Sequence, residues 1–251
     1  MIARNHAMQI RYVIFDLGGT LMHSRDPWET VHEQADAALV QSLKSNGVEL
    51  DAAIFRAHLH EYYKQRENDH RETTYHFVLG ELLKELGHAD VAESTIRSAL
   101  DALYHVTQQN WELESDSIET LKTLKSKNYR IGIFSNAGDD KDVQDLIDSF
   151  DIRAYLDFVL TSAACFYRKP HPRAFEIALA HWNAFPEETV MIGDSLEADI
   201  FGAKQAGMTS IWITRRAEFK GEDIRRIQPD FSLRKLSELP PTLERIAISR
   251  R

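Results

Sequence analysis

The sequence contains a single cysteine and no long hydrophobic run. Cys165 alone cannot form an internal disulfide, so nothing indicates an oxidising compartment. No segment approaches the roughly 20 apolar residues that a membrane-spanning helix requires. Residues 1–9 are polar where a signal peptide would be apolar. We therefore expect a soluble, cytoplasmic protein.

Basic residues are also scarce. The chain has 30 Lys and Arg against 39 Asp and Glu, which gives a formal net charge of -9. Nucleic acids and anionic membranes attract clustered positive charge, so we expect neither as a partner. A length of 251 residues allows one large domain or a core with a smaller second unit. We expect the second arrangement, in a monomer or a homodimer.

Short apolar runs rich in strand-forming residues recur along the chain, and helical patterns separate the later ones. Such alternation predicts an α/β fold with a doubly wound parallel sheet, a Rossmann-like core. In such sheets ligands bind beyond the carboxyl ends of the strands. Asp16, Ser135 and Asp194 directly follow strand-like runs, so we expect their side chains to converge. The runs are residues 12–15, 131–134, 158–160, 190–192 and 211–213, with a possible edge strand at 231–233.

The stretch 21–112 has helical periodicity and no convincing strand, and it is far longer than an ordinary connection. We expect it to form a smaller all-helical domain, with residues 1–20 and 113–251 forming the core. Asp26, Pro27 and Glu29 have the pattern of an N-cap, a first-turn proline and a capping-box acid. A second helix of this segment is expected to start at Thr73 and to end at Gly87.

Four polar motifs follow one another at the expected strand ends. Together they resemble the motifs of the haloacid dehalogenase-like hydrolase superfamily, most of whose members are magnesium-dependent phosphatases. The resemblance spans nearly the whole chain, and the helical segment lies where that family has its cap domain. The motifs are FDLGGT at residues 15–20, FSN at 134–136, KP at 169–170, and GDS at 193–195 with Asp199.

The resemblance implies that Asp16 is a nucleophile that forms an aspartyl-phosphate. It also implies that the side chains of Asp16 and Asp194, with the backbone carbonyl of Gly18, hold Mg²⁺. The physical chemistry agrees, because a carboxylate can attack an anionic phosphate ester only if a cation offsets the repulsion. Magnesium prefers such oxygen ligands.

The remaining motif residues are expected to contact the phosphate. By the resemblance, Ser135 and Asn136 donate hydrogen bonds to it, and Thr20 does the same or caps the turn. Lys169 supplies a fixed positive charge. Asp199 lies five residues after Asp194, and we expect it to hold a metal-bound water or Lys169, unless it is only an acid favoured by a helix N-terminus.

One position departs from the family pattern. Most phosphatases of the family have a second aspartate where this chain has Gly18, and that residue protonates the leaving group. Such an acid typically contributes about 10²–10⁴-fold to the rate. Acyl and aryl phosphates need little protonation, so they remain possible substrates. His23 is the nearest candidate for a substitute, with Arg25 as a nearby anion-binding side chain, although a lone histidine there is more often a loop residue.

Three alternatives to a phosphatase follow from Gly18. The 2-haloacid dehalogenases also lack the second aspartate, but they need no metal. Phosphonate hydrolases use a cap lysine, for which Lys44 and Lys64 are undistinguished candidates. A phosphate-binding protein without efficient turnover is the third. Because the acidic motif residues would repel one another strongly without a cation, we favour a magnesium-dependent phosphohydrolase for a small phosphate ester.

Overall fold

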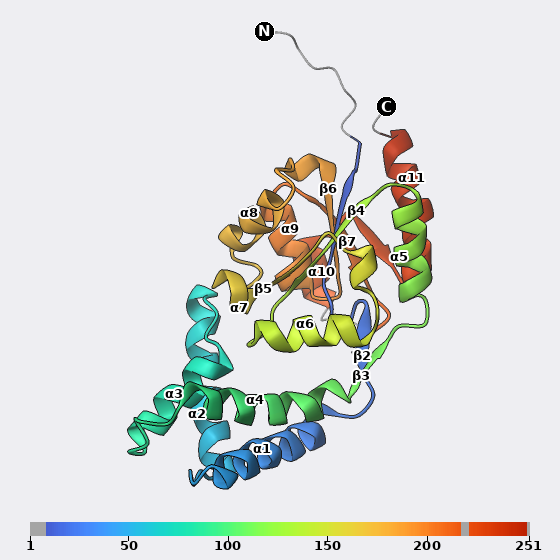
Figure 1. Cartoon of the computed structure of the whole chain (residues 1–251). Coiled ribbons are helices and arrows are strands. Elements are labelled where there is room, and N and C mark those ends of the chain that lie inside the picture. Colours follow the sequence, from blue (N-terminus) through green and yellow to red (C-terminus); the bar gives the residue numbers. More distant parts are fainter. Residues whose placement is uncertain (1–8, 217–220, 250–251) are drawn as a thin grey trace.

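The computed structural model describes residues 9–216 and 221–249 (Figure 1). Most of the polar N-terminal stretch, residues 1–8, lies outside them. The core is a six-stranded parallel sheet with the strand order β5-β4-β1-β6-β7-β8. The six expected strands are therefore confirmed. They are β1 (Tyr12–Phe15), β4 (Arg130–Ser135), β5 (Phe158–Thr161), β6 (Thr189–Gly193), β7 (Thr209–Ile213) and β8 (Phe231–Leu233).

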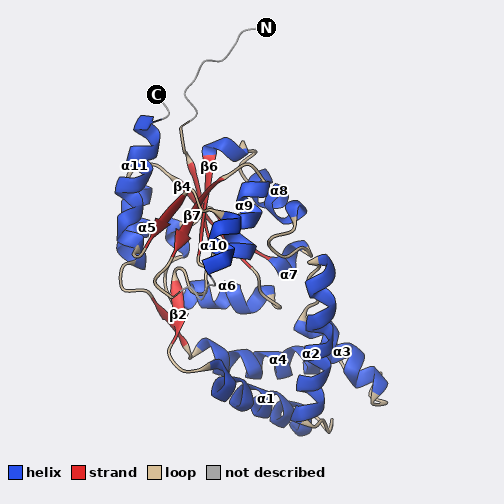
Figure 2. Cartoon of the chain, turned by 180° about the vertical axis from the view of Figure 1, so that it is seen from behind, coloured by secondary structure: helices blue, strands red, loops and turns tan. Residues whose placement is uncertain are grey.

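Both faces of the sheet are buried, because alternate side chains of each strand enter different hydrophobic clusters. In β1, Val13 and Phe15 pack on one face and Ile14 on the other. Figure 2 shows helices on both sides of the sheet. The first face is covered by α5 (Ser117–Ser126), α6 (Asp140–Ser149) and α11 (Leu239–Ser249), and the second by α7 (Ser162–Cys165), α8 (Pro172–Ala180) and α9 (Gly202–Gln205). The doubly wound Rossmann-like class is confirmed.

Four helices lie between β2 and β3 in the chain, and beside the end of the sheet in space (Figure 1). They have a hydrophobic cluster of their own, which includes Leu39, Leu79 and Leu100. This separate cluster supports the division into a core and a cap, which stays a prediction. The helices are α1 (Trp28–Ser45), α2 (Ala52–Asp69), α3 (Tyr75–Glu85) and α4 (Glu93–Gln108).

The expectation that 21–112 contains no strand is wrong. β2 (Met22–Ser24) and β3 (Trp111–Leu113) form an antiparallel pair that joins the helices to the core. Strands of three residues are too short to give a period-2 signal. None of the described helices is long and apolar enough to cross a bilayer.

Two expected helix starts are also wrong. Asp26 does not cap α1, which begins at Trp28 with no side-chain cap. The backbone of Asp26 instead exchanges hydrogen bonds with the side chain of Asn110 at the other end of the insert. Thr74, not Thr73, caps α3 by accepting a hydrogen bond from the backbone N–H of Phe77.

Candidate active site

Asp16 lies one residue beyond β1, where the strands on both sides also end. Its backbone N–H donates to the carbonyl of Ile192 in β6 at 2.8 Å, which fixes the start of the following turn. Its carboxylate accepts hydrogen bonds from Lys169 Nζ at 2.7 Å and from Thr20 Oγ1 at 3.4 Å. The residue is only 8% exposed, so this carboxylate is held in one orientation.

Gly19 allows Asp194 to lie close to the turn that follows β1. Gly19 has φ +79°, and a Cβ atom there would lie 2.2 Å from Asp194 Oδ2. A side chain at position 19 would therefore displace this carboxylate. Asp194 follows β6, and its carbonyl accepts a hydrogen bond from Trp212 Nε1 at 2.8 Å. Because Gly19 has no side chain, the Asp194 carboxylate can approach Asp16.

Lys169 lies at the centre of the acidic residues. Its buried ammonium donates to Asp16 Oδ1 at 2.7 Å, to Asp199 Oδ1 at 2.6 Å and to the carbonyl of Phe134 at 2.7 Å. Asp199 also accepts a hydrogen bond from the backbone N–H of Ser195 at 3.0 Å. Burial alone lowers the pKa of Lys169, but the charges of Asp16 and Asp199 outweigh it and raise the pKa above the ordinary value.

The carboxylates of Asp16, Asp194 and Asp199 each offer an oxygen atom, and these three atoms lie within 4.8 Å of one another. Burial, and then the charge of Asp16, raises the pKa of Asp194 to about 7. The pKa of Asp199 rises to about 6, mainly by burial and against the opposing effect of Lys169. Three acids against one lysine leave excess negative charge. An all-oxygen donor set of this kind suits a hard divalent cation.

These residues surround a cavity of about 330 Å³ that Gly18 and Ser135 also line. Ser135 is buried at the end of β4. Asn136 uses its side chain to hold Lys169: its amide oxygen accepts from the Lys169 N–H at 2.8 Å, and its amide nitrogen donates to the Lys169 carbonyl at 3.0 Å. The phosphate-binding roles of Ser135, Asn136 and Thr20 stay predictions.

The space for a second acid is taken by Trp111, which the sequence did not single out. A Cβ atom at Gly18 would lie 2.8 Å from the indole Cη2 of Trp111, a residue of β3. Trp111 is 93 residues away in the chain, so no local pattern could have predicted this contact. The absence of a side chain at position 18 therefore leaves room for the indole of Trp111.

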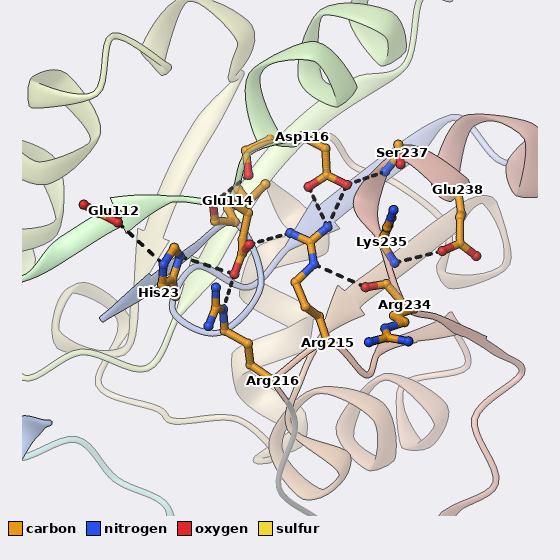
Figure 3. A network of polar contacts seen from close by, with 12 residues as sticks. His23, Glu112, Glu114, Asp116, Arg215, Arg216, Arg234, Lys235, Ser237 and Glu238 are labelled. Carbon is orange, nitrogen blue, oxygen red and sulfur yellow. Dashed lines mark hydrogen bonds and ion pairs between the residues drawn. The ribbon is translucent and has the colours of Figure 1, made fainter. Parts of the chain in front are cut away.

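His23 does not replace the missing acid in this geometry. It lies between Glu112 and Glu114, with ring nitrogens 3.7 Å and 3.3 Å from their carboxylate oxygens (Figure 3). It is not among the residues that line the cavity around Asp16. Arg25 is exposed and lies 3.7 Å from Glu112.

The two lysines considered for phosphonate chemistry lie elsewhere on the cap helices. Lys44 lines a separate hollow with Glu49 and Leu50, and the exposed Lys64 contacts Glu61 at 3.4 Å. Neither lines the cavity around Asp16. The structure therefore gives no support to a phosphonate hydrolase.

Comparison with known proteins agrees with this geometry. Residues 45–213 match the family model described as haloacid dehalogenase-like hydrolase. The chain is 30% identical to a glyceraldehyde 3-phosphate phosphatase of Methanopyrus kandleri, over 95% of this chain and 99% of that protein. It is 27% identical to the protein of that name from Pyrococcus furiosus, over 94% of both.

A solved structure shows the same fold. The crystal structure of a 2-haloacid dehalogenase from Pseudomonas syringae superimposes with a TM-score of 0.73 at 26% identity. The alignment covers 94% of this chain and 99% of that one. These two sequence relatives are named as phosphatases, whereas this structural relative is named as a dehalogenase.

Proposed function

The chain belongs to the haloacid dehalogenase-like hydrolases, and from that membership we propose that it is a magnesium-dependent phosphohydrolase for a small phosphate monoester. The observation that carries the proposal is the convergence of Asp16, Asp194 and Asp199 around Lys169. Phosphatase-named relatives over nearly the full chain support it.

Asp16 is the proposed nucleophile. Its carboxylate oxygen attacks phosphorus, a phosphorus–oxygen bond to Asp16 forms, and the bond to the leaving oxygen breaks. Water then attacks the aspartyl-phosphate, which releases inorganic phosphate and restores the carboxylate. Lys169 and Thr20 contact the Asp16 carboxylate, so they fix the direction from which it meets the phosphate.

Asp16, Asp194 and the Gly18 carbonyl are the proposed ligands of Mg²⁺, with Asp199 holding Lys169. When bound, this ion neutralises charge on the phosphate and on the crowded carboxylates. Ser135 lines the cavity next to Asp16 and is placed to donate its hydroxyl proton to a phosphate oxygen. Lys169 keeps a fixed positive charge beside the reacting group.

We further propose that residues 21–112 act as a cap over this site. Several contacts hold them against the core. Arg97 of α4 donates to Asp139 at 2.6 Å, Gln108 of α4 donates to Asp142 at 2.8 Å, and the backbone N–H of Tyr75 donates to the Gly138 carbonyl at 3.1 Å. These contacts hold the helical segment against the residues that follow β4, which supports the proposal.

Carbon–halogen hydrolysis is the second candidate, because the structural relative is named as a 2-haloacid dehalogenase. That reaction needs no metal and no proton donor, which agrees with Gly18. The crowding of Asp16, Asp194 and Asp199 argues against it, since three acids with oxygen atoms within 4.8 Å of one another leave excess negative charge beside the single charge of Lys169.

The test compares two reactions of the purified protein. With Mg²⁺ we expect phosphate release from acetyl phosphate, loss of that activity with a chelator, and background activity for Asp16→Asn. Asp90→Asn, an exposed acid of the cap, is the matched control and should be fully active. Metal-independent chloride release from 2-chloropropionate, with no phosphate release, would overturn the proposal.

A further inference from the structure

A second cavity, of about 210 Å³, adjoins the one around Asp16. The two cavities share Trp111, Asn136, Ala137 and Asp142, so they lie next to each other between the helices of residues 21–112 and the core. A substrate whose phosphate lies at Asp16 can therefore extend its other end into the second cavity.

Aromatic side chains form two walls of this second cavity. One wall is formed by Trp28, whose ring meets the edge of Trp111 with centroids 5.0 Å apart and stacks on His32 at 5.3 Å. A second wall is formed by Tyr75, which lies 6.0 Å from Tyr63 and 5.9 Å from Tyr104 between ring centroids. A cavity lined by such rings suits a flat ring that can stack or pack edge to face.

A buried hydroxyl of this cavity has no partner. Tyr104 is 7% exposed, and its hydroxyl has no hydrogen-bond partner among the described residues. Burial, and then the charge of Asp139, raises the pKa of Tyr104 well above the ordinary value, so the hydroxyl keeps its proton. Leaving such a donor unsatisfied is costly, and a small shift of the Tyr104 ring towards the cavity would let a polar group on a bound ligand remove that cost.

The second cavity has no unpaired cation among its described lining residues. Arg56 is paired with Asp36 of the cap, and Arg168 is paired with Glu72. A ligand whose far end is uncharged therefore fits this cavity better than one whose far end is anionic. An apolar cavity of roughly 150 Å³ holds one benzene molecule, so about 210 Å³ fits a single substituted ring.

The chemistry at Asp16 points to the same kind of ligand. Trp111 lies where a side chain at position 18 would begin, so the leaving oxygen receives no proton from an acid at that position. A phenol has a pKa of about 10, whereas that of a hydroxyl such as water is about 15.7. A phenolate is thus the far better leaving group at a site without an acid.

We propose that the substrate is the phosphate monoester of a single-ring phenol, with its ring between the tryptophan and tyrosine walls. This inference rests on the proposed function. The phosphorus–oxygen bond to the ring breaks as the bond to Asp16 forms, and phenolate leaves with the electron pair and takes its proton from solvent. Water then hydrolyses the aspartyl-phosphate.

The experiment compares three substrates with native protein and Mg²⁺. Phenyl phosphate has the ring and the good leaving group, benzyl phosphate has the ring with an alcohol leaving group, and acetyl phosphate has a good leaving group and no ring. We expect kcat/KM for phenyl phosphate to exceed that for benzyl phosphate at least tenfold, and to exceed that for acetyl phosphate. Hydrolysis of acetyl phosphate without this preference for phenyl phosphate would overturn the inference alone. No hydrolysis of any of the three would overturn the proposed function as well.

Variants of Trp28 separate ring recognition from leaving-group chemistry. Trp28→Leu should lower kcat/KM for phenyl phosphate roughly 2- to 10-fold, as loss of an aromatic contact does, and leave acetyl phosphate within twofold. Trp28→Phe should recover most of the loss. Trp182→Leu is the matched control, because Trp182 stacks on Tyr12 away from the cavity. Equal effects of Trp28→Leu on both substrates would contradict the proposed place of the ring.

Discussion

At the scale of single residues, the pairing of Gly18 with Trp111 decides what this site can do. Replacing an aspartate by glycine removes an acid, but here the freed space is filled by an indole from another part of the chain. A water molecule or a cap side chain therefore has less room to act in its place. The site keeps Asp16, the proposed nucleophile, and its charged groups, and it has no acid at position 18.

This pairing predicts the outcome of restoring the acid. Gly18→Asp alone should not raise activity on benzyl phosphate, because the new side chain meets the Trp111 ring. The double variant Gly18→Asp/Trp111→Ala should raise that activity by about 10²-fold, the lower end of the range for a general acid. The measurement is kcat/KM for benzyl phosphate. Trp111→Ala alone is the control, and an equal gain in that variant would contradict the role assigned to the acid.

The polar residues of the site could be predicted from the sequence, whereas its walls could not. Asp16, Ser135 and Asp194 each follow a strand-like run, and parallel strands bring such ends together. Trp111 and Tyr104 lie at positions where only tertiary packing decides which way the side chain points. The hydrogen bonds of Asn136 to Lys169 were missed for the same reason.

At the scale of elements, the strand pair β2–β3 joins helices α1–α4 to the core, and a network of charges anchors it. Glu114, next to β3, is buried and accepts hydrogen bonds from Arg215 and Arg216, which follow β7 (Figure 3). Arg215 also donates to Asp116 at 2.9 Å and 2.8 Å. Burial alone raises the pKa of Glu114, but the two arginines outweigh it and hold the pKa below the ordinary value.

Removing the charge of Glu114 should destabilise the protein in a pH-dependent way. Glu114→Gln should lower the free energy of unfolding by roughly 1–3 kcal/mol near pH 7, because buried donors lose their partner. Since the folded pKa is lowered, this stabilisation is present above about pH 4.3 and is lost as the pH falls below it. The difference between native protein and variant should therefore shrink at low pH.

Urea unfolding at about pH 7 and about pH 3.5 measures this difference. Glu112→Gln is the matched control, because Glu112 contacts His23 as Glu114 does, but the side chain of Glu112 is 51% exposed. We expect that variant to stay within about 0.5 kcal/mol of the native protein. A loss for Glu114→Gln of the same size at both pH values would show that its charge is not the cause.

Most elements could be predicted from apolar runs or hydrophobic periodicity, and the strand pair β2–β3 could not. The core strands follow apolar runs in the sequence, and α3 has buried apolar residues at helical spacing. β2 and β3 have three residues each and are held by their cross-strand pairing. The start of α1 differs because Asp26 pairs with Asn110, a contact across 84 residues of sequence.

At the scale of the whole molecule, the site lies beyond the carboxyl ends of the core strands, where three acidic side chains and Lys169 meet. The carboxylates of Asp16, Asp194 and Asp199 repel one another in the folded protein, and among the described residues Lys169 is the cation that contacts them. A divalent cation that binds there should stabilise the folded state as a whole, because it binds the folded chain and not the unfolded one.

Magnesium should therefore raise the melting temperature of the native protein. At a concentration 100 times the Kd, a stabilisation of about 2.7 kcal/mol corresponds to roughly 5–10 °C for a chain of this size. Asp194→Asn should lose most of this shift, and Asp90→Asn should keep it. Thermal unfolding with Mg²⁺ and with chelator measures the effect. An undiminished shift in Asp194→Asn would place the ion elsewhere.

The identity of the group that Asp16 carries during turnover tests the central claim most directly. On the nucleophilic carboxylate a phosphatase forms an acyl phosphate and a dehalogenase forms an ester, and the two adducts have different masses. Native protein mixed with phenyl phosphate and Mg²⁺, quenched in acid and digested, should yield the peptide with Asp16 carrying one phosphoryl group. An unmodified peptide under turnover, or an adduct only after treatment with 2-chloropropionate, would contradict a phosphohydrolase that works through Asp16.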